Sequence, residues 1–261
     1  MTERIKNFWG NQLGKGGSQC GFTLAEVLIT LGVIGVVAAV TMPMLTVRVK
    51  EQQRVSQLKK AYSVLNQAYL RATQKYGPAE NWDLVITDTG TTDEEGDPIY
   101  DYSGSVKALN YLAEFMNAKR GDENLFFAVY NLHGVLRNDK FEMPNDRYVY
   151  LNDNTVLYTG WVNIDGAFDL VVMFSDCLKN GKCTLGKDLF YFIMTSDNGI
   201  LPKGLQYSNS KYDITPFESA CNKKLDVALN GLSCTAWVIY NGNMDYLHCD
   251  DLSWSGKHKC K

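Results

Sequence analysis

Cysteines are the residues in this 261-residue chain whose side chains are best suited to covalent or metal chemistry. Six of the seven lie in its last third: Cys177, Cys183, Cys221, Cys234, Cys249 and Cys260. An even, clustered set indicates disulfides in an exported domain. Six cysteines allow 15 pairings. Short loops favour three of them, although the sequence alone leaves the pairing open: Cys177–Cys183, Cys221–Cys234 and Cys249–Cys260.

Zinc is the alternative use for the last two cysteines. The tail places thiols beside imidazoles: His248, Cys249, His258 and Cys260. Zinc sites use these residue types, but the spacings match no common zinc pattern. Because an exported domain favours oxidation, disulfides are the preferred interpretation and no metal site is expected.

An acidic stretch could offer oxygen ligands to calcium. Its members are Asp88, Asp93, Glu94, Glu95 and Asp97. Calcium prefers such ligands, but the spacing is not that of an EF-hand loop. We therefore expect a solvated loop and no cofactor, with calcium as the alternative.

Catalytic chemistry is not expected. The three histidines, His133, His248 and His258, lie in no recognised nucleophile motif. The formal net charge of −3 gives no reason to expect a nucleic-acid partner. The prediction is therefore a chain that is not an enzyme and has no catalytic residues.

One isolated acid, Glu26, interrupts the apolar run from Phe22 to Val47. The run exceeds the roughly 20 residues that a membrane-spanning helix needs. A carboxylate costs about 2.5–3.5 kcal/mol at the centre of such a helix and less near its end. A cleaved secretory signal would have a shorter apolar region, but "VVAAVTMP" could imitate its cleavage site, so this alternative stays open. A plain signal anchor would also be apolar, but it leaves the acid unexplained.

The apolar run continues into an amphipathic pattern. Val55, Leu58, Tyr62, Leu65, Tyr69, Ala72 and Tyr76 follow the three-and-four spacing of one helix face. Gly77-Pro78 should end the helix. The sequence thus predicts one helix over 22–76, transmembrane over about 22–47, with a kink at Pro43.

Residues 77–261 are predicted to form an exported globular α+β domain. A turn-rich connector should occupy 81–104, and a helix should follow over 105–120, ending before Gly121. Residues 147–151 and 155–159 flank "NDN" and predict a hairpin. Further strands are expected where β-branched and aromatic residues gather, at 167–174, 188–195 and 235–240.

The stretch "GFTLAEVLITLGVIGVVAAVTMP" resembles the N-terminal signature of type IV pilins and type II secretion pseudopilins. In that family a basic leader ends in glycine, phenylalanine follows, and glutamate is the fifth mature residue. Gly21, Phe22 and Glu26 match these positions, and Pro43 matches the family's helix proline. A looser match, "NGKCTLGKDLFYFIMTSDNGILPKG", resembles a β-region of secretion-type pilins, with Cys183 as a departure.

The resemblance implies a fold and a sequence of events. The fold is a long helix packed on a C-terminal antiparallel sheet. A prepilin peptidase would remove the leader, 1–21, by cutting between Gly21 and Phe22, and Phe22 would be N-methylated. The subunit would wait among inner-membrane lipids, with its domain outside the cytoplasm. An assembly platform would then add it to other pilin or pseudopilin subunits, where Glu26 pairs with a neighbour's terminal amine.

Two functions follow from the resemblance. The first is a major or minor structural subunit of a type IV pilus or a type II secretion pseudopilus. The second is a tip-located minor pilin that binds a surface, DNA or a secreted substrate. An exported enzyme on a pilin-like anchor is a more distant third interpretation. The sequence does not distinguish secretion, motility, adhesion and DNA uptake.

Overall fold

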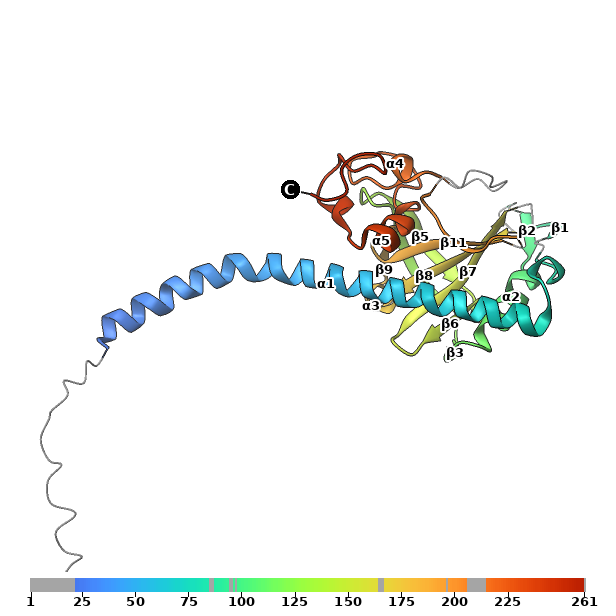
Figure 1. Cartoon of the computed structure of the whole chain (residues 1–261), viewed down its shortest axis with the longest axis horizontal. Helices are drawn as coiled ribbons and strands as arrows, with labels where there is room; N and C mark the ends of the chain where they lie inside the picture. The colour runs from blue at the N-terminus through green and yellow to red at the C-terminus, as the bar shows by residue number, and fades with distance from the viewer. Residues whose placement is uncertain are drawn as a thin grey trace, which may run out of the picture. The chain divides into compact units, whose positions relative to one another are not determined.

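The computed structural model describes residues 22–84, 87–93, 96, 98–163, 167–195, 197–205 and 215–260. Within it the chain divides into two compact units, at the boundary between Arg48 and Val49. The first unit contains the N-terminal part of one long helix, and the second contains the rest of that helix and every other described element. Figure 1 labels the helices and strands.

Helix α1 (Leu24–Tyr76) is 53 residues long, which confirms the predicted long N-terminal helix. It is the one described helix that is long and apolar enough to span a membrane. Pro43 lies within it. Gly77 follows with a positive φ of 83°, a conformation that suits glycine and ends the helix.

The second half of α1 packs on the globular unit through a stripe of small and aliphatic side chains. The buried members are Val55, Leu58, Ala61, Leu65, Ala68 and Ala72. Tyr62, Tyr69 and Tyr76 are only partly buried and flank the stripe. Tyr62 stacks on Phe192 with ring centroids 5.3 Å apart. The predicted face is confirmed, and Ala61 and Ala68 complete it.

A six-stranded antiparallel sheet forms the centre of the globular unit, in the order β11-β10-β8-β7-β6-β3. Its strands are β3 (Ala118–Arg120), β6 (Tyr148–Leu151), β7 (Thr155–Asn163), β8 (Ala167–Phe174), β10 (Leu189–Thr195) and β11 (Gly199–Pro202). The predicted 147–159 hairpin is confirmed as β6–β7, with Tyr150 opposite Val156. The strands predicted at 167–174 and 188–195 are also confirmed.

Both faces of this sheet are covered, so β8 has apolar residues at nearly every position. Phe168, Leu170 and Val172 face the cluster that contains the α1 stripe. Val171 and Met173 belong to a second cluster. That cluster lies against a three-stranded sheet of β5 (Leu136–Met143), β4 (Leu125–Tyr130) and β9 (Lys182–Thr184).

The connector predicted over 81–104 contains more structure than expected. A 3-10 turn, η1 (Ala79–Asn81), leads to a separate two-stranded sheet of β1 (Thr87–Thr92) and β2 (Pro98–Asp101). Their side chains are almost all exposed, so no hydrophobic alternation marked these strands in the sequence.

Helix α2 (Ser103–Ala113) is shorter than predicted. The expected helix ran to residue 120, but 118–120 form β3, which pairs with β6. Gly121 is therefore not a helix cap. A side chain there would collide with the ring of Tyr148, at 2.0 Å from its nearest atom, so Gly121 permits close packing.

The strand predicted at 235–240 is wrong, because this segment forms helix α5 (Cys234–Asn241). Thr235, Ala236, Trp237 and Val238 are all buried, so the short segment shows no one-sided periodicity. Gly242 ends the helix in the left-handed conformation. The remaining helices are α3 (Ser175–Lys179), α4 (Phe217–Ala220) and η2 (Asp245–Leu247).

Candidate assembly site

The N-terminal turn of α1 holds Glu26 in a reciprocal capping arrangement. The Thr23 amide donates to Glu26 Oε2 at 2.8 Å, and the Thr23 hydroxyl donates to the same oxygen at 2.7 Å. In return, the Glu26 amide donates to Thr23 Oγ1 at 3.2 Å. This is a capping box, in which a threonine and a glutamate three residues later satisfy amides that the helix leaves unpaired.

Sequence reasoning missed the part that Thr23 plays, although the T-x-x-E pattern in "TLAE" was a usable signal. The carboxylate that looked isolated already has two donors in its own chain. It also lies at the positive end of the helix dipole. An acid at this position is therefore less unfavourable in a membrane than one placed further along the run.

The predicted processing site adjoins this turn. Phe22 is highly exposed, at 88% of its possible surface. Gly21, and the rest of the leader with Cys20, lie outside the described residues. Cleavage at Gly21–Phe22, N-methylation of Phe22 and a kink at Pro43 therefore stay predictions.

Beyond Glu26, α1 exposes an apolar surface on all sides. The large apolar side chains exposed there are Val27, Leu28, Ile29, Leu31, Val33, Ile34, Val36, Val37, Val40, Met42, Leu45 and Val47. A continuous exposed surface of this kind marks contact with lipid or with other proteins. This surface must therefore be covered by bilayer lipid, by neighbouring helices, or first by one and then by the other.

Arg54 joins α1 to the globular unit where the helix begins to be buried. Its guanidinium contacts Asp188 at 2.8 Å and Asp176 at 3.0 Å, and donates to the Lys187 carbonyl at 2.8 Å. Burial raises the pKa of the Asp188 carboxyl, although Arg54 opposes that shift. In the sequence Arg54 was only one of several basic residues after the apolar run, so its partners could not be found.

Three disulfides cross-link the last third of the chain. Cys177–Cys183 joins α3 to β9, and Cys221–Cys234 joins the end of α4 to the start of α5. Cys249–Cys260 closes the C-terminal segment. These are the same three pairs that short loops favour.

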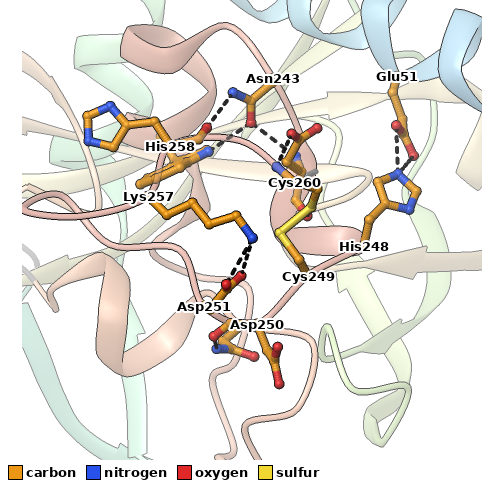
Figure 2. Close-up of a disulfide and its surroundings, with 12 residues drawn as sticks. Glu51, Asn243, His248, Cys249, Asp250, Asp251, Lys257, His258 and Cys260 are labelled. Carbon is orange, nitrogen blue, oxygen red and sulfur yellow. Dashed lines mark hydrogen bonds and ion pairs between the residues drawn. A yellow bond between two sulfur atoms is a disulfide. The ribbon is translucent and has the colours of Figure 1, made fainter.

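Hydrogen bonds and ion pairs surround the Cys249–Cys260 disulfide (Figure 2). Asn243 Nδ2 donates to the His258 carbonyl at 3.1 Å, and the Lys257 ammonium contacts Asp251 at 2.8 Å. His248 Nε2 lies 2.9 Å from Glu51 Oε1, so the segment also contacts α1. The segment is thus held from several sides.

The four residues of the zinc alternative have other partners in this structure. Zinc binds thiolates, and the disulfide consumes both Cys249 and Cys260. His258 contacts the Trp254 carbonyl through Nε2, whereas His248 turns to Glu51. Across the described ranges, no three metal-binding side chains gather in one place.

The acidic stretch proposed for calcium is described only in part. Asp88 Oδ1 accepts the Gly90 amide at 2.8 Å, as in an ordinary turn. Glu94, Glu95 and Asp97 lie outside the described residues. Calcium binding there therefore stays an untested alternative.

Comparison with known protein families identifies both parts of the chain. Residues 44–242 match a family of unknown function, DUF6613. The chain belongs to the DUF6613 family. Residues 17–42 of this DUF6613 protein match the prokaryotic N-terminal methylation motif. No curated protein and no solved structure matches the chain.

The methylation motif and the fold give this DUF6613 protein a class. The motif is the prepilin cleavage and methylation signature, typical of type IV pilins and pseudopilins. Here it leads into a long helix that is apolar in its first part and packs on antiparallel sheets in its second part. Together with three disulfides, these features indicate a pilin-like structural subunit, anchored in the inner membrane, with an extracytoplasmic domain.

Proposed function

We propose that this protein is a structural subunit, major or minor, of a type IV pilus or a type II secretion pseudopilus. One observation carries the proposal: the methylation motif covers residues 17–42, and the large apolar side chains of α1 within that range are exposed. Prepilin peptidase cuts between Gly21 and Phe22, Phe22 is methylated, and the assembly platform inserts the subunit among others of its kind.

Assembly in this proposal exchanges one set of Glu26 contacts for another. Before assembly, the Thr23 amide and hydroxyl satisfy the carboxylate. Cleavage creates an amine at Phe22, which is protonated near neutral pH because its reference pKa is about 8. In the fibre, Glu26 of one subunit pairs with the amine of its neighbour. Loss of one partner of such a buried pair costs about 3–5 kcal/mol, because the other charge is left unpaired.

The test is Glu26→Ala, with Glu80→Ala as a matched control that removes an exposed acid from the globular unit. We expect mature Glu26→Ala protein that begins at Phe22 by intact mass, but at least about tenfold less subunit in sheared fibres, consistent with that cost. Glu80→Ala should match the wild type in both assays. Normal fibre incorporation of Glu26→Ala would contradict the charge pair, and wild-type protein isolated from the membrane with its leader still attached would contradict the processing.

A second candidate is a tip-located minor pilin that binds a surface, DNA or a secreted substrate. A surface cavity of about 720 Å³, lined in part by Tyr100, Tyr102 and Tyr111, favours this candidate. Aromatic walls with a few polar groups are common in ligand sites. Gold labelling along the fibre shaft would support the structural subunit, whereas labelling confined to tips would support the binding role.

A further inference from the structure

A polar cavity lies where α1 joins the globular unit. Its volume is about 250 Å³. Three segments line it: α1, the β6–β7 turn and the junction of β8 with α3. The side chains are Lys50, Gln53, Arg54 and Gln57 from α1, Asp153, Asn154 and Thr155 from the turn, and Phe174, Ser175 and Asp176 from the junction.

The lining carries two cations and two carboxylates, so its formal charge is balanced. Arg54 pairs with Asp176, and Asp153 pairs with Lys60 at 3.0 Å. Lys50 is exposed and makes no ion pair within the described part of the chain. Asp176 keeps 60% of its side-chain surface exposed, so it can accept a further donor. One free cation and one accessible acid thus lie at the same cavity.

The Thr155 hydroxyl is an unsatisfied group in this lining. Thr155 is 1% exposed, and its Oγ1 has no hydrogen bond of normal geometry, although the Asp153 carboxylate lies beside it. A buried hydroxyl without a partner is unfavourable, because it loses its hydrogen bonds to water and gains none in return. This oxygen is almost fully covered, so it is not itself a contact for a ligand.

The position of the cavity along α1 suggests where such a ligand comes from. Val47 is the last residue of the apolar run, and Lys50 follows about 4.5 Å further along the helix. The polar headgroup layer of a bilayer is roughly 5–7 Å deep on each side. Lys50 follows the apolar run by three residues, so among the lining residues it lies nearest to the headgroup layer when the run spans the membrane.

We infer that this cavity binds the zwitterionic phosphoethanolamine headgroup of a membrane phospholipid. Lys50 and the uncharged donors, Gln53 among them, contact the phosphate. Asp176 accepts hydrogen bonds from the primary ammonium. An anionic glycerol headgroup brings Asp176 no cation in addition to Arg54, and a choline headgroup has no N–H to donate. This inference requires membrane anchoring but not fibre assembly.

Native mass spectrometry of the full-length protein in detergent can test the site. Phosphatidylethanolamine, phosphatidylglycerol and phosphatidylcholine of equal chain length would be titrated separately. Phosphatidylethanolamine should bind at least about tenfold more tightly than the other two, as one additional charged hydrogen bond provides. Equal binding of the three lipids would overturn the inference. It would also be overturned if free phosphoethanolamine bound as tightly as phosphatidylethanolamine, because the ligand would then not need to come from the membrane.

Two variants locate the binding. Lys50→Ala and Asp176→Asn should each weaken phosphatidylethanolamine binding about tenfold. Lys59→Ala is the matched control, because it removes a cation from an exposed α1 position that does not line the cavity. Unfolding midpoints of all three variants establish that the fold is retained. If Lys50→Ala binds this lipid as tightly as Lys59→Ala does, the inference is wrong. Because the assay uses unassembled subunits, a failed fibre assay leaves its outcome unaffected.

Discussion

At the scale of single residues, Thr23 and Glu26 show how one carboxylate serves two states. In the separate subunit the acid closes the first turn of its own helix. In the proposed fibre it meets a charge from another subunit. The capping contacts are local and weak enough to be replaced, because an N-cap contributes typically about 1 kcal/mol.

Replacing Thr23 by valine keeps the shape and removes the hydroxyl. We expect amides in the first turn of α1 to exchange with solvent about fivefold faster in detergent, which corresponds to the loss of about 1 kcal/mol. Thr30→Val is the control, since its hydroxyl donates only to the Val27 carbonyl within the helix. Equal exchange rates in the two variants would show that the capping box contributes nothing.

A second residue-scale prediction concerns the ion pair between Lys203 and Asp169. The ammonium lies 2.7 Å from Asp169 Oδ1, and both side chains are largely buried. Lys203→Met leaves the carboxylate unpaired, so unfolding at pH 7 should become easier by about 3–5 kcal/mol. The double variant Lys203→Met/Asp169→Leu should recover most of that loss. Urea denaturation measures both, and a single variant as stable as the wild type would refute the argument.

The same pair predicts a dependence on pH. Burial raises the pKa of Asp169, so the folded state keeps this proton at a pH where the unfolded state has lost it. The contribution of Asp169 to stability therefore falls as pH rises from about 4 through the raised pKa. In Lys203→Met the opposing charge is absent, so the destabilisation should be smaller at pH 4.5 than at pH 7. A loss that is constant across this range would contradict the assignment.

At the scale of elements, Arg54 is the main polar link between α1 and the segment from α3 to β10. Arg54→Met should destabilise the domain by about 3 kcal/mol, because Asp188 would remain buried without its cation. Arg71→Met is the control, as it removes the same charge from an exposed position on α1. Chemical denaturation compares them, and equal midpoints would show that Arg54 is dispensable.

Elements with a regular pattern could be predicted from the sequence, and elements defined by tertiary contacts could not. The buried residues of the α1 stripe recur at helical spacing, and the two strands of the β6–β7 hairpin flank a recognisable turn. The first five residues of α5 are all buried and show no one-sided pattern, so the β-branched and aromatic residues of this segment suggested a strand. Lys203 and Asp169 are far apart in sequence, and Thr155 looks like any other strand residue. Their environments exist only in the folded chain.

At the scale of the whole molecule, the boundary between Arg48 and Val49 separates an anchor from a domain with its own core. A chain starting at Val49 retains the entire buried stripe of α1, which begins at Val55. We expect it to be a soluble monomer that unfolds cooperatively in urea, as measured by size-exclusion chromatography and circular dichroism. Aggregation or gradual unfolding under oxidising conditions would show that the apolar half is needed for folding.

The placement of the disulfides has a mechanical consequence. All three close loops within the last third of the chain, and α1 itself contains no cysteine. Tension transmitted through the helix is therefore resisted by side-chain packing and by ion pairs such as Arg54–Asp188, without a covalent link. The force needed to detach α1 from its domain should be the same in oxidised and reduced protein, although reduction breaks the disulfides of the C-terminal third.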